Sequence, residues 1–133
     1  MTSRSAPTRL VVDTDVLIDV LRDQPEAVAF LEGTEQPLAT SVITVAELHA
    51  GVRDGKERRR LDVFVEAFAV LALGPATAQR AGLWRWQYGP RHGTGLAGAL
   101  IAASAEAVCA TLITLNRRPF LMLAEVLVPC ARS

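Results

Sequence analysis

The sequence predicts an α/β fold of three layers, in which a mainly parallel five-stranded sheet is flanked by helices on both faces. Five short runs rich in Val, Ile and Leu have the length of buried strands, and segments with helical spacing of apolar residues separate them. Strands that alternate with helices are typical of parallel sheets. A chain of 133 residues, 50% of them hydrophobic, fits one domain. We therefore expect a single domain over residues 9–130, preceded by a disordered N-terminus at 1–8.

The expected elements follow one another in a regular order. Strands are predicted at 10–13, 37–41, 70–73, 111–114 and 126–128. Helices are predicted at 16–22, 26–32, 45–52, 57–68, 76–88 and 97–107. The second helix follows a proline suited to a first helical turn, and the fourth places Leu61, Phe64 and Phe68 on one face. In such folds ligands bind outside the carboxyl ends of the strands, so this edge is where a site is expected.

Charge and cysteine content exclude several classes of protein. The formal net charge is zero, which argues against purely electrostatic binding to nucleic acid. Cys109 and Cys130 have neither the spacing of a metal site nor that of a disulfide framework. The chain shows no secretion signal and no apolar run of membrane-spanning length. We expect a cytoplasmic protein that does not associate with membranes.

The stretch GTGLAGALIAAS at 93–104 reads as G-x-G-x-x-G running into an apolar helix, the pattern of a dinucleotide-binding loop. That loop needs a strand before the first glycine and an acidic residue about twenty residues later. The polar, basic segment LWRWQYGPRH precedes it, and Arg117 and Arg118 stand at the later position. The pattern therefore does not indicate a nucleotide site, and its glycines need another explanation.

Acidic and polar residues stand where predicted strands end. Asp13 directly follows the first strand, and Thr114 and Asn116 end the fourth. A carboxylate that leaves the sheet at this edge can serve as an oxygen ligand to a hard cation. Asp13 could instead only cap the following helix. Glu47 stands in TSVITVAELHAGV, where Thr44-x-x-Glu47 also fits a capping box at the start of a helix.

Four segments in a fixed order resemble the PIN-domain nucleases, specifically the VapC toxins of bacterial toxin–antitoxin pairs. They are VVDTDVLID, TSVITVAELHAGV, LAGALIAASA and TLITLNRRPF, and the resemblance extends over 10–128. It implies the toxin of a type II toxin–antitoxin system, an endoribonuclease that depends on Mg²⁺, with Mn²⁺ as an alternative. It also implies a cognate VapB-type antitoxin as partner, RNA as substrate and a homodimer.

The resemblance assigns roles to individual residues. Asp13 matches the first acid of the family's metal site and Glu47 the second. Asn116 stands where many members carry a fourth acid, and Pro119 occupies an alternative position for that acid. Mg²⁺ needs several oxygen ligands, and carboxylates from separate elements supply them while leaving room for water and a substrate phosphate.

Gly98 stands where the family has its third acid, an Asp within LAxALIAASA. Residues 67–105 contain no Asp or Glu, so no neighbour replaces it. The glycine pattern of 93–98 is then a by-product of this change. Three explanations are open: an inactivating substitution, a natural glycine that packs closely or caps the helix, and replacement of the ligand by Asp15. Asp15 is better suited to holding the Asp13 loop by hydrogen bonds, because both residues lie in the same loop.

Other residues are expected in supporting positions. Thr44 and Thr114, together with Asp15, are predicted to support the acids. Arg117 and Arg118 would either meet RNA phosphates or remain solvated loop charges. Of the two tryptophans at 84 and 86, which cannot share one helix face, one should be exposed and mark a dimer interface.

Two other functions remain open. VVDTDVL nearly fits the D-x-D-x-[TV] signature of haloacid-dehalogenase-like phosphatases, with Asp13 as nucleophile and Asp15 as acid–base. Leu17 departs from that signature, the only lysine is Lys56 in a charged turn, and no later acidic pair follows. The third possibility is a non-catalytic module that only binds its antitoxin, because Gly98 removes a metal ligand.

Overall fold

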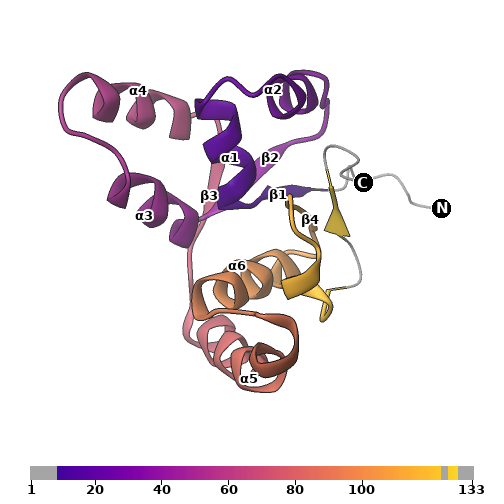
Figure 1. Ribbon diagram of the computed structural model, residues 1–133. Coiled ribbons are helices and arrows are strands. Elements are labelled where there is room, and N and C mark those ends of the chain that lie inside the picture. The colour runs from indigo at the N-terminus through magenta and orange to yellow at the C-terminus, as the bar shows by residue number, and fades with distance from the viewer. Residues whose placement is uncertain (1–8, 124–125, 129–133) are drawn as a thin grey trace.

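The computed structural model, which describes residues 9–123 and 126–128, has the predicted three-layer α/β fold (Figure 1). Its strands are β1 (Leu10–Val12), β2 (Leu38–Ser41), β3 (Ala69–Leu71), β4 (Thr111–Ile113) and β5 (Val126–Leu127). They form one sheet in the order β3-β2-β1-β4-β5, and every neighbouring pair is parallel. The expected N-terminal disorder at 1–8, Cys130 and the end of the predicted domain lie outside the described residues.

Six α-helices connect and cover the strands. They are α1 (Thr14–Leu21), α2 (Pro25–Glu32), α3 (Val42–Ala50), α4 (Lys56–Val65), α5 (Pro75–His92) and α6 (Leu96–Ala107), and a 3-10 turn, η1 (Arg118–Phe120), was not predicted. Helices α1, α2 and α4 lie on one side of the sheet, while α5 and α6 lie on the other (Figure 1). Within the described residues, no helix is both long and apolar enough to span a membrane.

The central strand β1 sends its side chains into both cores. Val11 packs with α5 and α6, whereas Leu10 and Val12 pack with α1 and α4. This follows from the two-residue period of a strand, because successive side chains point to opposite faces. All three side chains are at most 5% exposed. A strand buried on both faces reads as a continuous apolar run, which is why it was visible in the sequence.

Small residues line the buried surface of helix α6. Ala99, Ala102, Ala103 and Ala105 are all buried, each at most 1% exposed. Gly95 is the N-cap of this helix, and Gly93 ends α5 with a φ of 70°, a backbone conformation that favours glycine. A helix, and not a strand, therefore leads into the glycine-rich stretch, which agrees with its exclusion as a dinucleotide-binding loop.

The predicted capping box of Thr44 and Glu47 is wrong. Helix α3 begins at Val42, and Ser41 is its N-cap, with the Ser41 Oγ accepting a hydrogen bond of 2.8 Å from the Ile43 N–H. The last residue of β2 is therefore itself the cap, so the chain enters the helix without a loop. Thr44 and Glu47 lie inside the helix, and their side chains are free to serve other contacts.

Candidate functional site

A pocket of about 310 Å³ lies outside the carboxyl ends of β1 and β4. From β1, the chain adds β2 and β3 on one side of the sheet, and β4 and β5 then follow on the other side of β1. The pocket therefore lies where the order of the strands reverses. The residues that the sequence nominated from four separate segments all line it, namely Asp13, Asp15, Glu47, Gly98, Thr114 and Asn116. The parallel topology is what brings these distant segments to one edge.

Asp13 is held in place at the end of β1 by two hydrogen bonds. Its Oδ1 accepts from the Thr14 N–H at 2.8 Å, so it caps α1, and its Oδ2 accepts from the Thr114 hydroxyl at 2.8 Å. The side chain is only 7% exposed. Burial raises the pKa of Asp13 to about 6, and the neighbouring charge of Asp15 adds to the shift. Asp13 thus combines the capping role with a carboxylate in the pocket.

Asp15 links the first turn of α1 to the segment after β4. Its two carboxylate oxygens accept from the Leu115 N–H at 3.3 and 3.2 Å, and its Oδ2 lies 3.3 Å from the Thr114 hydroxyl. Burial raises the pKa of this carboxyl as well. These contacts agree with a role in holding the Asp13 loop. They disfavour replacement of the missing ligand by Asp15, because both of its oxygens are engaged away from α6.

Glu47 reaches the pocket from α3 and has an exposed side chain. Its Oε1 accepts a hydrogen bond of 2.6 Å from the hydroxyl of Thr14, the first residue of α1. Thr44 supports the acid indirectly, because its hydroxyl lies 2.9 Å from that of Thr14. Sequence reasoning missed Thr14. Its partners lie 30 and 33 residues away, and no local pattern shows such a contact.

Gly98 occupies the third position of α6 and lines the pocket. A Cβ at this position would meet only two ring carbons of Phe120, both at 3.8 Å, which is an ordinary van der Waals contact. The N-cap of the helix is Gly95. The explanations that Gly98 packs closely against a neighbour or caps the helix are therefore wrong, because a Cβ has room at this position and Gly95 is the cap.

Asn116 lies in the exposed loop that follows β4. Its amide Oδ1 accepts from the Arg118 N–H at 3.3 Å, and its backbone N–H donates to the Thr114 hydroxyl oxygen at 3.3 Å. The carbonyl of Pro119 accepts a hydrogen bond of 2.6 Å from the buried Thr94 hydroxyl, which ties this loop to the start of α6. Arg117 and Arg118 are exposed beside the pocket and do not line it.

The donor set matches a hard divalent cation in kind but not in number. Residues with carboxylate and amide oxygens line the pocket. Burial raises the pKa of Asp13, and a cation would relieve the repulsion from Asp15 and Glu47 that adds to this shift. Across residues 9–123 and 126–128, however, no group of three or more His, Cys, Asp or Glu side chains could hold a metal ion.

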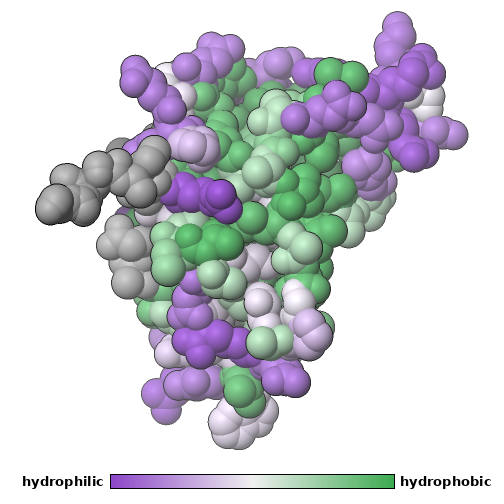
Figure 2. Space-filling model, turned by 180° about the vertical axis from the view of Figure 1, so that it is seen from behind, coloured by the Kyte–Doolittle hydropathy of each residue, from purple (hydrophilic) through white to green (hydrophobic). Residues whose placement is uncertain are grey.

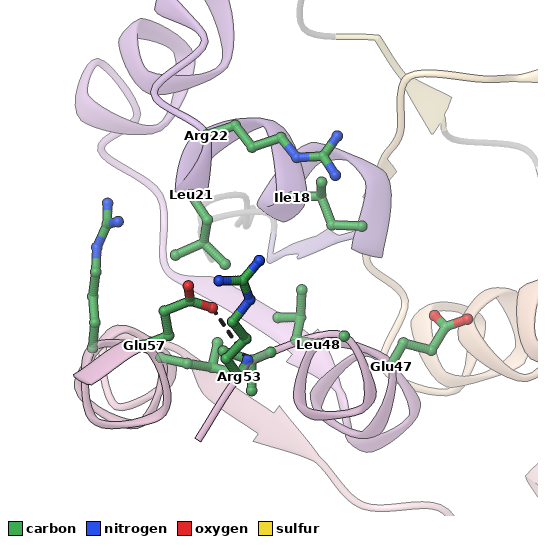
Figure 3. Close-up of a pocket in the computed structure, with 11 residues that line it drawn as sticks. Ile18, Leu21, Arg22, Glu47, Leu48, Arg53 and Glu57 are labelled. Atoms are coloured by element: carbon green, nitrogen blue, oxygen red, sulfur yellow. Dashed lines mark hydrogen bonds between the residues drawn. The ribbon is translucent and has the colours of Figure 1, made fainter. Parts of the chain in front are cut away.

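A larger groove of about 640 Å³ adjoins the pocket and runs between α1, α3 and α4 (Figure 3). Ile18 and Glu47 line both cavities, so the two are adjacent. Leu21, Leu48 and Leu61 make part of the groove apolar. Its lining also carries charges of both signs, those of Arg22, Arg53 and Arg60 and those of Glu47 and Glu57.

Comparison with known proteins places these features in a family. Residues 10–126 match the model of the PIN domain. Ribonuclease VapC10 of Mycobacterium tuberculosis is 37% identical over 125 residues, which span 92% of this chain and 93% of that protein. Ribonuclease VapC19 of the same organism is 32% identical over 123 residues, which span 90% of this chain and 98% of that protein.

A solved structure gives the same answer at the level of the fold. A toxin–antitoxin complex from Klebsiella pneumoniae superposes with a TM-score of 0.79 at 27% identity, covering 91% of this chain and 98% of that chain. The sequence match, the fold and the position of the acidic pocket agree. The chain belongs to the PIN-domain family.

Proposed function

We propose that this chain is the toxin of a type II toxin–antitoxin pair, with an endoribonuclease site that Gly98 impairs. The observation that carries the proposal is the single pocket in which Asp13, Glu47 and Asn116 surround position 98. The relatives VapC10 and VapC19 are both named ribonucleases, which supports RNA as the substrate. The fit of a side chain at position 98 supports the loss of an acid there.

In this proposal, Asp13 and Glu47 are the two remaining metal ligands for Mg²⁺ or Mn²⁺, and Asn116 contributes an oxygen nearby. A bound cation would lower the pKa of a water molecule and neutralise charge on the leaving oxygen. The Thr114 hydroxyl keeps the Asp13 carboxylate turned toward the pocket. Arg117 and Arg118, which are exposed in the loop after β4, are the residues proposed to meet a substrate phosphate.

The decisive experiment is cleavage of a mixed RNA pool by the wild-type chain and by its Gly98→Asp variant, with Mg²⁺ present. We expect the variant to cut at least about a hundredfold faster, because metal ligation contributes several kcal/mol of charge stabilisation. Gly98→Ala and Gly98→Asn are the matched controls, since they add a side chain without the charge. Asp13→Ala in the Gly98→Asp background controls for contaminating nuclease. Equal cleavage by wild type and Gly98→Asp would show that the site does not need an acid at 98.

A second candidate function is antitoxin binding without cleavage, and the groove between α1, α3 and α4 favours it. A groove lined by apolar side chains, three arginines and two glutamates fits an amphipathic segment that carries charged residues, and its adjacency to the pocket at Glu47 would let that segment reach the acids. The partner proposed is the cognate VapB-type antitoxin, in keeping with the toxin–antitoxin complex from Klebsiella pneumoniae. Co-purification with the antitoxin should survive Gly98→Asp and be lost in the double variant Arg53→Glu, Arg60→Glu.

An exposed apolar surface supports the proposed homodimer. Trp84 is buried whereas Trp86 is 81% exposed, as expected for two residues apart on one helix, and Leu83 on the same helix is 68% exposed. Figure 2 shows hydrophobic side chains gathered over the middle of the molecule seen from behind, whereas α5, which carries Leu83 and Trp86, lies at the lower end in Figure 1. Trp is enriched at the centres of protein interfaces.

The phosphatase alternative has less support. Its chemistry needs a lysine beside the phosphoryl group, and Lys56 begins α4 without lining the pocket. Asp15, its required acid–base, is engaged by the Leu115 N–H. Hydrolysis of small phosphate esters by the wild-type chain, lost in Asp13→Asn, would favour this function over the nuclease.

A further inference from the structure

We propose that Thr14 is a positioning residue that sets Glu47 and Asp13 at fixed places relative to one another. The proposal rests on the proposed nuclease site, whose acids these are, and it adds a residue that the sequence comparison did not assign a role. Thr14 lies between the two acids in space. It belongs to the same helix turn as Asp13, and its side chain faces α3, which carries Glu47.

Thr14 contacts both acids with different groups. Its backbone N–H donates to the Asp13 Oδ1 at 2.8 Å, and its hydroxyl oxygen lies 2.6 Å from the Glu47 Oε1. The same hydroxyl oxygen lies 2.9 Å from the hydroxyl of Thr44 on α3. One residue therefore joins the carboxylate at the end of β1 to the carboxylate on a helix that follows a different strand.

The direction of each hydrogen bond between Thr44, Thr14 and Glu47 follows from the chemistry of the groups. A carboxylate oxygen only accepts, so the single hydroxyl hydrogen of Thr14 is donated to Glu47. The contact between the two hydroxyls then requires Thr44 to be the donor to Thr14. Thr44 is 0% exposed, so water does not compete for its hydrogen. Thr44 thus donates a hydrogen bond to Thr14, and Thr14 donates one to Glu47. The second carboxylate oxygen of Glu47 stays available to the pocket.

The need for such a contact follows from the exposure of Glu47. A glutamate side chain on a helix surface has several rotamers open to it, and ordering it costs conformational entropy. Asp13 is buried and holds its position through two hydrogen bonds. Glu47 is exposed, and among the described residues its hydrogen-bond partner is the Thr14 hydroxyl. The position of Glu47 over the pocket therefore depends on this hydroxyl.

Three variants of the full-length chain test the role. Thr14→Val keeps the shape of the side chain and removes the hydroxyl, whereas Thr14→Ser keeps the hydroxyl and removes a methyl group. The Asp13 contact uses the backbone of Thr14, so it is retained in both variants. Thr40→Val is the matched control, because it removes another buried hydroxyl, one that donates to the Val12 carbonyl at 2.9 Å and does not touch the acids.

The first measurement is the position of Glu47 in crystal structures of wild type and the three variants. We expect its carboxylate to leave Thr14 and move toward solvent in Thr14→Val only, while Asp13 stays in place in all four proteins. An unchanged Glu47 in Thr14→Val would overturn the proposal, as would displacement of both acids together. The readout uses no metal and no RNA, so it decides the role of Thr14 even if the nuclease proposal fails.

The second measurement is calorimetric titration of the same proteins with Mn²⁺ in the Gly98→Asp background. Residues that orient metal ligands typically change metal affinity by about 10–100-fold, so Thr14→Val should bind Mn²⁺ at least about tenfold more weakly than its parent. Thr14→Ser should restore the affinity, and Thr40→Val should leave it unchanged. Equal affinity in Thr14→Val would contradict a positioning role. Absence of Mn²⁺ binding by the Gly98→Asp parent itself would count against the proposed metal site, while the crystal structures still decide the case of Thr14.

Discussion

Replacement of Asp13 by Asn should make the metal-free protein more stable at neutral pH, although it removes a residue of the site. Burial raises the pKa of Asp13 from 3.8 to about 6 in the folded chain. Between these two values the unfolded chain has already lost the proton that the folded chain still holds. Because the unfolded state then binds fewer protons, the stability of wild type falls as the pH rises from about 3.8 to about 6 and is level above it.

The magnitude follows from the size of the shift. One pKa unit corresponds to about 1.4 kcal/mol, so a shift of about two units costs wild type about 3 kcal/mol above pH 6. Asparagine carries no charge, so burial does not destabilise it in this way. Its side chain has one carbonyl oxygen, however, and cannot accept both hydrogen bonds of the Asp13 carboxylate, and the loss of one costs about 1 kcal/mol. The expected net gain for Asp13→Asn at pH 7.5 is about 1–2 kcal/mol.

The assay is urea unfolding in the presence of EDTA, at pH values from 4.5 to 7.5, for wild type and Asp13→Asn. The difference between the two proteins should grow in favour of the variant up to about pH 6 and stay level from there to pH 7.5. Asp54→Asn, at an exposed position, is the control and should show no comparable dependence on pH. A difference that stays constant over the whole range, or a variant less stable than wild type at pH 7.5, would refute the reasoning.

Three further predictions concern the rest of the molecule. Gly98→Ala should stabilise the fold by about 0.5–1 kcal/mol in thermal unfolding, because its Cβ meets only the ring of Phe120 at 3.8 Å; a loss of stability would mean that the position is tightly packed. Trp86→Lys should weaken self-association by about 2 kcal/mol in sedimentation equilibrium, and unchanged association would place the interface elsewhere. In His49→Gln, loss of the contact with Asp62 should cost at most about 1 kcal/mol. Since the pKa of His49 is raised by that contact, its contribution is complete below the unfolded pKa and fades as the pH rises through the folded pKa, which unfolding at several pH values would reveal.

The fold was largely predictable because its signals are local. Strands β1, β2 and β4 are short, largely buried runs, whereas β3 is mostly exposed and is not the buried strand that was expected at 70–73. Some boundaries carry their own marker, such as Pro25 at the start of α2. The start of α3 was predicted wrongly because a local signal was ambiguous there. Two candidate caps, Ser41 and Thr44, stand three residues apart, and only the pairing of β2 with its neighbours shows that Ser41 ends the strand and begins the helix.

Some features of the candidate site could likewise be predicted from the sequence, and others could not. The sequence by itself determined which acids are present and that residues 67–105 contain none, so Gly98 could be singled out before any coordinates. Only the tertiary structure decided that a side chain would fit at 98, that Asp15 is engaged elsewhere, and that Thr14 reaches Glu47. The physical reason is distance along the chain. Residue identity and local periodicity depend on neighbouring positions in the sequence. Packing space and hydrogen bonds between residues 30 or more positions apart arise only when the sheet brings separate segments together.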